Sequence, residues 1–257
     1  MAHMIDLPVA VVTGGAGGLG SAIGRALAAD GFQVVLAGRN LDAAQRVADD
    51  IGQSHSPRPY PGRVDVTNRE SVATLIGDIG ERFGRLDVLV NNAGTEPSNS
   101  LEDTTVADWD LTMDVNVKGA MLMSQAGVPF WRAQGTGSIV NISSRTHLGC
   151  VRNAAYVSSK AALVGLTREL AVELGPMGVR SNAVAPSFVL TPFNDQRRDL
   201  ADMEAMIAKY IAFTPLRRLI DPDDVANTVA FLASDRARNI TGEVIHVCAG
   251  SQLPPTL

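Results

Sequence analysis

The chain has 257 residues, of which 46% are apolar and 19% charged, and its formal net charge is −5. This length is sufficient for one sizeable hydrophobic core, and the composition is that of an ordinary globular protein. The mild acidity, with no block of like charges, argues against a basic surface for nucleic acid, and no apolar run is long enough to cross a bilayer.

Short runs rich in Val and Ile alternate with longer amphipathic stretches along the chain. The expected strands are Val9–Val12, Gln33–Ala37, Arg63–Val66, Leu86–Val90, Ser138–Ile142, Val179–Val184 and Glu243–Val247. The expected helices are Ser21–Ala29, Leu41–Ile51, Glu70–Phe83, Trp109–Gln125 and a long helix from Tyr156 to Leu174. Strands without polar alternation are buried on both faces, and helical crossovers between them favour a parallel sheet. The pattern predicts one doubly wound, Rossmann-like α/β domain over residues 5–257, with its ligand site at the carboxyl ends of the strands.

A segment at about 191–213 interrupts this alternation between the last two strands. It contains Pro192 and then a helical stretch with Met203 and Met206. Because it follows the carboxyl end of a strand, we expect it to form a lid over the ligand site. A plain pair of surface helices is the alternative.

A glycine-rich segment joins the first expected strand to the first expected helix. Glycine lets the backbone approach a ligand closely, and the start of a helix offers N–H groups to a pyrophosphate. The segment fits GxGxxG at Gly15, Gly17 and Gly20, and TGxxxGxG at Gly14, Gly18 and Gly20. Its position between a strand and a helix favours a dinucleotide site over a simple tight turn.

The end of the second expected strand bears on the choice of cofactor. NAD-binding chains usually carry Asp or Glu there, but here Gly38 is followed by Arg39. An arginine can pair with the 2′-phosphate that a carboxylate would repel, which predicts NADP(H). NAD(H) remains possible if Arg39 is only a solvated loop charge. Asp65, after the third expected strand, either accepts a hydrogen bond from the adenine amine or merely belongs to the turn before the next helix.

Tyr156 and Lys160 lie four residues apart and therefore on one face of the long helix. A phenol has an ordinary pKa of about 10, and a neighbouring ammonium group lowers it towards the range useful for proton transfer. The strand before this helix ends in Ser143 and Ser144. A serine hydroxyl at that place can donate a hydrogen bond to a substrate oxygen.

These motifs together resemble those of the short-chain dehydrogenase/reductase family, in its branch of chains of this length. The resemblance also includes NNAG at 91–94, Asn116 within a helix, and ITGE at 240–243, and it covers nearly the whole chain. It implies the TGxxxGxG alignment, a seven-stranded parallel sheet in the order 3-2-1-4-5-6-7 with helices on both faces, and a homotetramer. Ser144 lies one residue closer to Tyr156 than is usual in the family, so Ser143 remains the alternative serine.

The resemblance assigns roles to four residues. Tyr156 is the general acid/base, Lys160 lowers its pKa and binds ribose, Ser144 polarises the substrate oxygen, and Asn116 holds a water in a proton relay. The implied cofactor contacts are Gly14, Gly18, Leu19, Gly20, Arg39, Asp65, Val66, Asn92, Ala93, Gly94, Tyr156, Lys160, Pro186, Val189 and Thr191.

The sequence thus predicts a cytoplasmic enzyme that transfers a hydride between NADP(H) and a carbonyl or alcohol carbon. A 3-oxoacyl-thioester reductase and a sugar, sugar-acid or polyol dehydrogenase are rival forms of this activity. A non-catalytic dinucleotide-binding regulator is the alternative from another class. Arg145 and Arg152, between Ser144 and Tyr156, favour a polar or anionic substrate unless they are solvent-facing loop charges. Cys150 and Cys248 stand outside any CxxC or Cys/His cluster, so no metal site is expected.

Overall fold

The computed structural model describes residues 7–97, 100–149, 152–191 and 200–253. Seven strands form one sheet in the order β3-β2-β1-β4-β5-β6-β7, and all neighbouring strands pair in parallel. The strands are β1 (Val9–Thr13), β2 (Gln33–Gly38), β3 (Tyr60–Arg63), β4 (Val88–Asn91), β5 (Gly137–Ile142), β6 (Val179–Pro186) and β7 (Val244–Val247). The predicted doubly wound α/β fold and its strand order are confirmed.

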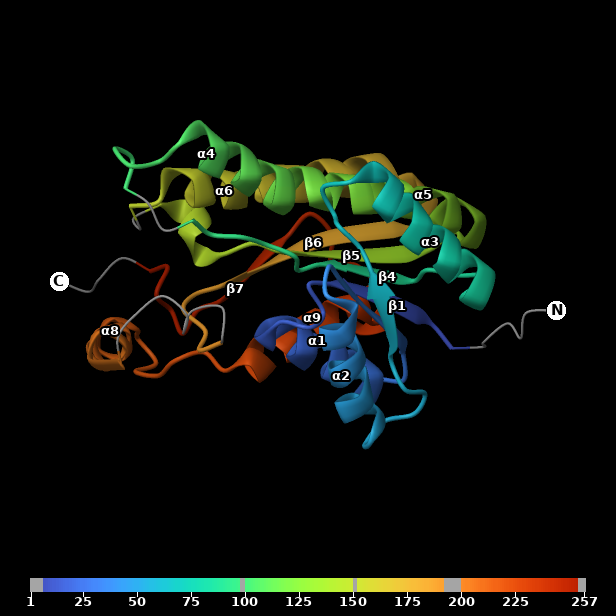
Figure 1. The fold of residues 1–257 in the computed structure, drawn as a ribbon, viewed down its shortest axis with the longest axis horizontal. Helices are drawn as coiled ribbons and strands as arrows, with labels where there is room; N and C mark the ends of the chain where they lie inside the picture. Colours follow the sequence, from blue (N-terminus) through green and yellow to red (C-terminus); the bar gives the residue numbers. More distant parts are fainter. Residues whose placement is uncertain (1–6, 98–99, 150–151, 192–199, 254–257) are drawn as a thin grey trace.

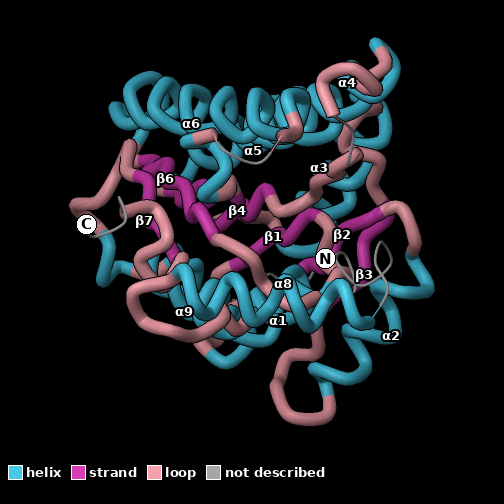
Figure 2. Tube along the Cα trace, turned by 90° about the vertical axis from the view of Figure 1, so that its left-hand side faces the viewer, coloured by secondary structure: helices cyan, strands magenta, loops and turns pink. Residues whose placement is uncertain are grey.

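Two layers of helices cover the sheet (Figures 1 and 2). One layer contains α1 (Gly18–Ala29), α2 (Leu41–Gly52) and α9 (Pro222–Ala233). The other contains α3 (Arg69–Phe83), α4 (Val106–Met113), α5 (Gly119–Gln134) and α6 (Ala154–Leu174). A further helix, α8 (Leu200–Phe213), lies outside both layers at one end of the sheet (Figure 1). Short helical turns are η1 (Asp114–Lys118), η2 (Arg145–Leu148), η3 (Gly175–Met177) and η4 (Asp235–Ala237).

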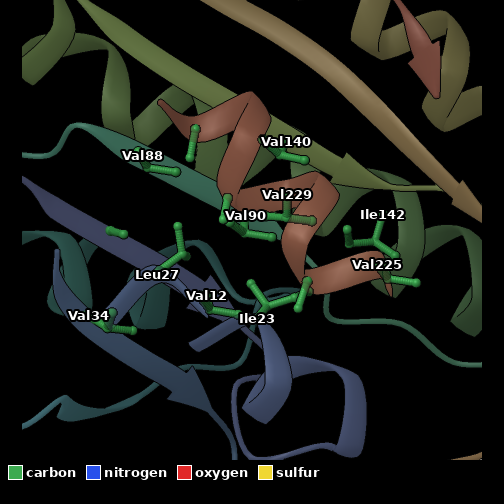
Figure 3. Close-up of a cluster of buried hydrophobic side chains, with 14 of the residues drawn as sticks. Val12, Ile23, Leu27, Val34, Val88, Val90, Val140, Ile142, Val225 and Val229 are labelled. Carbon is green, nitrogen blue, oxygen red and sulfur yellow. The ribbon is translucent and has the colours of Figure 1, made fainter. Parts of the chain in front are cut away.

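Alternating residues of the strands enter two separate hydrophobic clusters. In β1, Ala10 and Val12 belong to the cluster beneath α1 and α9, whereas Val9 and Val11 belong to the cluster on the opposite face. Figure 3 shows side chains of the first cluster, including Val12, Ile23, Leu27, Val225 and Val229. Because both faces are buried, the sheet holds the loops at its carboxyl edge in fixed relative positions.

The third strand lies at residues 60–63, so the prediction of Arg63–Val66 was wrong. Pro61 and Gly62 resemble turn residues in the sequence, but β3 is an edge strand that pairs only with β2, and an edge tolerates proline. Gly62 packs closely against α3, since a Cβ there would lie 2.7 Å from Leu75 Cδ1. The other strands lie where expected, with ends that differ by a residue or two.

The expected single helix at Trp109–Gln125 is also corrected. The helical region runs from Val106 to Gln134, and the π-helical turn η1 separates α4 from α5. Thr105 sets the start, because its side chain accepts a hydrogen bond from Asp108 N. The π turn contains Asn116, and such turns often occur at functional sites.

The helical part of the predicted lid corresponds to α8. Residues 192–199 of that segment, including Pro192, lie outside the described residues, as does the side chain of Met203. Within the described part of the chain, no helix combines the length and apolar character needed to span a membrane.

Candidate active site

A cavity of about 810 Å³ opens at the carboxyl ends of the strands. Its wall is built by the loops after β1, β2, β4, β5 and β6, by the first turns of α6, and by Met206 and Tyr210 of α8. The structure brings most of the predicted site residues into this wall: Gly14, Gly18, Leu19, Gly20, Arg39, Asn92, Ala93, Gly94, Ser144, Tyr156, Lys160, Pro186, Val189 and Thr191. Asn116, Asp65 and Val66 are outside it.

The glycine-rich segment forms a backbone cradle at one end of the cavity. Gly14 has a φ of 65°, and Gly17 N donates to Gly14 O at 3.0 Å. A Cβ at Gly20 would overlap the carbonyl oxygen of Gly14, so only glycine fits there. No side chain caps the start of α1, which leaves the helix terminus suited to a negatively charged ligand. The cradle therefore fits the pyrophosphate of a dinucleotide.

Thr13, which the sequence analysis did not single out, joins this cradle to the loop after β4. Its Oγ1 accepts hydrogen bonds from Asn92 N and Ala93 N, both at 3.0 Å. Asn92 Nδ2 in turn donates to Thr13 O at 2.9 Å and to Gly14 O at 3.2 Å. The threonine of the TGxxxGxG pattern is thus the residue that fixes the two loops relative to each other.

Lys160 is buried beside Tyr156 in the middle of the cavity wall. Its Nζ donates to Ile142 O at 2.8 Å and lies 5.4 Å from the centre of the Tyr156 ring. Burial lowers the pKa of Lys160 to about 8, while the charge of Glu96 acts in the opposite direction. The ammonium group is therefore mainly protonated at neutral pH and lies near the phenol.

Asn153, the other residue that the sequence analysis missed, determines where α6 begins. Its side chain accepts from Tyr156 N at 3.1 Å and donates to Pro97 O at 2.7 Å. This cap places Tyr156 in the first turn of the helix and connects it to the loop after β4. An Asn three residues before a helical tyrosine was the available indication in the sequence.

The two serines at the end of β5 differ in their hydrogen bonds. Ser143 Oγ donates to the main-chain oxygen of Lys160 at 3.0 Å. Ser144 Oγ lies 3.5 Å from Pro186 O, the limit for a hydrogen bond, and accepts from Thr146 N at 3.2 Å. Both residues line the cavity and both are buried.

Asn116 lies behind the cavity wall. Its Nδ2 donates to Ser159 Oγ and to Thr95 O, both at 3.0 Å, and its Oδ1 accepts from Thr95 N at 2.8 Å. A Cβ at Gly94 would lie 3.4 Å from Asn116 Oδ1 and 3.7 Å from Lys160 Nζ. Gly94 thus lies close to both the asparagine and the lysine.

Asp65 and Val66 do not reach the cavity lining. Asp65 Oδ1 accepts from Thr67 Oγ1 at 2.7 Å and from Thr67 N at 3.0 Å. These hydrogen bonds, and to a smaller extent the charge of Arg39, lower the pKa of the Asp65 carboxyl. Val66 is buried against Gly119, where a Cβ would lie 2.7 Å from Val66 Cγ2.

Comparison with known proteins decides the family. The family model described as Enoyl-(Acyl carrier protein) reductase matches residues 14–252. The chain belongs to the short-chain dehydrogenase/reductase family, as the sequence motifs predict.

Relatives of known name cover almost the whole chain. It is 38% identical to the (2S)-[(R)-hydroxy(phenyl)methyl]succinyl-CoA dehydrogenase subunit BbsD of Thauera aromatica, over 95% of this chain and 96% of that protein. It is 37% identical to the 3-oxoacyl-[acyl-carrier-protein] reductase FabG of Staphylococcus aureus, over 94% and 96%. A crystal structure of a short-chain type dehydrogenase/reductase from Mycobacterium marinum superposes with a TM-score of 0.89 at 31% identity, covering 96% of each chain.

The chain is therefore an oxidoreductase whose family uses a nicotinamide dinucleotide. The glycine cradle is the feature of this structure that fits such a cofactor. Among the described residues, no cluster of three or more His, Cys, Asp or Glu side chains suits a metal ion.

Proposed function

We propose that the protein is an NADP(H)-dependent enzyme that interconverts a ketone and a secondary alcohol, with a 3-oxoacyl thioester as its ketone substrate. One observation carries this proposal: Tyr156, Lys160 and Ser144 share a single cavity with the glycine cradle. We further propose that the enzyme acts in the cytoplasm as a homotetramer, as is common in its family.

The three side chains have complementary roles in this reaction. The bound cofactor supplies the hydride in reduction and accepts it in oxidation. Tyr156 donates its phenolic proton to the substrate oxygen during reduction, and the Lys160 ammonium stabilises the resulting phenolate. Ser144 donates a hydrogen bond to the same substrate oxygen as negative charge develops on it. Asn116, through its contacts with Thr95 and Ser159, is placed to hold a water that returns a proton towards Lys160.

Ser144 is preferred to Ser143 because of their different partners. The hydroxyl of Ser143 donates to a buried main-chain oxygen, a bond that substrate binding would have to break. The Ser144 hydroxyl donates only in a marginal contact with Pro186 O, so its hydrogen can turn into the cavity at little cost while Oγ still accepts from Thr146 N.

The proposed cofactor contacts combine the cavity lining with the roles that the family resemblance implies. The cradle of Gly14, Gly18, Leu19 and Gly20 holds the pyrophosphate. Arg39, exposed at the end of β2, pairs with the 2′-phosphate. Asp65 and Val66 lie outside the cavity lining, and for them an adenine contact rests on the resemblance to the family alone. The loops after β4 and β6 hold the ribose and nicotinamide parts through Asn92, Ala93, Gly94, Pro186, Val189 and Thr191, together with Tyr156 and Lys160.

The names of the relatives favour a thioester substrate over a sugar or polyol. FabG is named for a 3-oxoacyl group on acyl carrier protein, and BbsD for a hydroxy(phenyl)methyl-succinyl group on coenzyme A. In both substrates the reacting oxygen belongs to an acyl group that is bound to its carrier as a thioester. A non-catalytic regulator is disfavoured because it would not need Tyr156, Lys160 and Ser144 together in the cavity.

The test is NADPH oxidation with acetoacetyl-CoA by the wild-type enzyme and three variants. We expect Tyr156→Phe and Ser144→Ala each to lower kcat by about 10²–10³-fold, because each removes a donor to the substrate oxygen. Ser143→Ala is the matched control and should retain most of kcat. NADPH binding, measured by fluorescence, should stay nearly unchanged in Tyr156→Phe. Full turnover by Tyr156→Phe would refute the proposed mechanism.

A further inference from the structure

The cavity is positively charged although the protein as a whole is negative. Among the described residues in its wall, four carry a positive charge and one a negative charge: Arg39, Arg145, Arg152 and Lys160 against Glu96. The formal net charge of the chain is −5, so composition does not account for this excess.

Two of the cations have functions elsewhere in the proposed site. Arg39 lies at the cradle end, with the cofactor, and Lys160 lies beside Tyr156. Glu96 acts on Lys160, whose pKa it raises. Arg145 and Arg152 therefore remain on the substrate side, and neither forms an ion pair with any residue that the structure describes.

Arg145 directly follows Ser144, at the first position of η2. It is half-buried in the cavity wall, and its charge adds to burial in lowering the pKa of His246 on β7. A guanidinium group in this position places positive potential next to the Ser144 hydroxyl, the proposed hydrogen-bond donor to the substrate oxygen.

Arg152 is held in an unusual backbone conformation beside the same cavity. Its φ is 49°, in the left-handed region that non-glycine residues adopt at a cost. The next residue is Asn153, whose side chain bonds both to the start of α6 and to Pro97 O. Arg152 therefore directly precedes the cap of α6, and its exposed side chain lines the cavity.

Arg152 also borders a second recess. Together with Leu101, Ala154 and Val157 it lines a mainly apolar cavity of about 340 Å³, next to the catalytic one. Arg152 and Asn153 belong to both walls. A substrate that extends from the reacting carbon towards this recess would pass Arg152.

From this arrangement we propose that Arg152, assisted by Arg145, binds an oxyanion of the substrate that is remote from the reacting carbon. The group is a carboxylate at the far end of the acyl chain, and the apolar recess receives the hydrocarbon next to it. Arginine suits this task because its planar fork can bind a carboxylate through two parallel hydrogen bonds. The inference rests on the proposed oxoacyl reduction and adds a preference for dicarboxylic acyl groups.

The experiment compares two N-acetylcysteamine thioesters, which carry no phosphate. The 3-oxosuberyl thioester has a terminal carboxylate that an alkyl chain separates from the reacting ketone, and the acetoacetyl thioester has none. We expect the wild-type enzyme to prefer the first, and Arg152→Met to lower kcat/KM for it by about tenfold, mainly through KM. The acetoacetyl thioester should lose less than about twofold. Arg152→Lys should restore part of the preference.

Arg132→Met is the matched control, because Arg132 is an exposed arginine outside both cavities. It should leave both substrates unchanged, and Arg145→Met should reduce the preference less than Arg152→Met.

If Arg152→Met affects both thioesters equally, or neither, the inference is wrong while the proposed function stands. If Arg152→Met lowers kcat/KM for acetoacetyl-CoA but not for the acetoacetyl N-acetylcysteamine thioester, Arg152 binds a phosphate of the carrier. That result would overturn the dicarboxylate preference. A wild-type enzyme that reduces none of these thioesters would contradict the proposed function itself.

Discussion

At the scale of single residues, Lys160 illustrates a conflict between stability and the proposed activity. An ammonium group is among the most costly groups to bury, and within the described part of the chain this one hydrogen-bonds only to Ile142 O. Its pKa of about 8 means that the folded state binds this proton more weakly than the unfolded chain does. Burial of the protonated Lys160 therefore lowers the free energy of unfolding by its full amount below pH 8, and hence at neutral pH.

We predict that Lys160→Met abolishes turnover and yet raises the free energy of unfolding of the cofactor-free protein at pH 7. Removal of the buried charge should contribute about 3 kcal/mol and loss of the hydrogen bond should cost about 1 kcal/mol, for a net gain of about 2 kcal/mol. Urea unfolding at pH 7 measures the difference. Lys118→Met, at an exposed lysine paired with Asp114, should change the value by less than about 0.5 kcal/mol. A Lys160→Met protein less stable than the wild type would show that the ammonium stabilises the fold.

At the scale of elements, the sequence was informative where a residue type has a local meaning. The glycine cradle and the four-residue spacing of Tyr156 and Lys160 could be predicted because backbone sterics and helix periodicity determine them. The edge strand β3 could not, because a proline in a strand is acceptable only at an edge and the edge is a property of the whole sheet. The π turn at Asn116 was missed because a helical apolar pattern does not distinguish a single π turn from a continuous α-helix.

The contact between η2 and β7 likewise joins residues far apart in sequence. His147 Nε2 and His246 Nε2 are 2.9 Å apart, and their ring centres are 5.1 Å apart. One ring must donate and the other accept, so the pair needs at least one neutral imidazole. The two residues are 99 positions apart, so no local sequence pattern indicates this contact.

We predict that this pair makes the protein less stable in mild acid. Burial lowers the pKa of both histidines, and the neighbouring cations Arg168 and Arg145 lower it further. The unfolded chain therefore binds these protons more readily, so stability falls as pH decreases below about 6.5. His147→Asn/His246→Asn should lose less stability between pH 7 and pH 5 than the wild type, as measured by thermal unfolding. His55→Asn is the control, and identical pH profiles for wild type and double variant would disprove the role of the pair.

At the scale of the whole molecule, the cavity depends on elements from both halves of the chain. The cradle comes from the segment between β1 and α1, and the proposed catalytic side chains come from the end of β5 and from α6. Met206 and Tyr210 of α8 complete the wall. Phe188, after β6, stacks on Tyr210 of α8 with ring centres 5.1 Å apart, which ties α8 to this wall. A ligand that fills the cavity therefore contacts segments that separate when the protein unfolds.

Because of this arrangement, cofactor binding should raise the stability of the whole protein, and the size of the shift should identify the cofactor. A ligand at a hundred times its dissociation constant stabilises the folded state by about 2.7 kcal/mol. If Arg39 pairs with the 2′-phosphate, NADPH will raise Tm more than NADH at matched concentration, and Arg39→Met will reduce the NADPH shift to that of NADH. Arg46→Met, on the exposed face of α2, is the control and should retain the difference. Equal shifts in the wild type would mean that Arg39 does not select the phosphate, and a larger shift with NADH would favour an oxidative role for the enzyme.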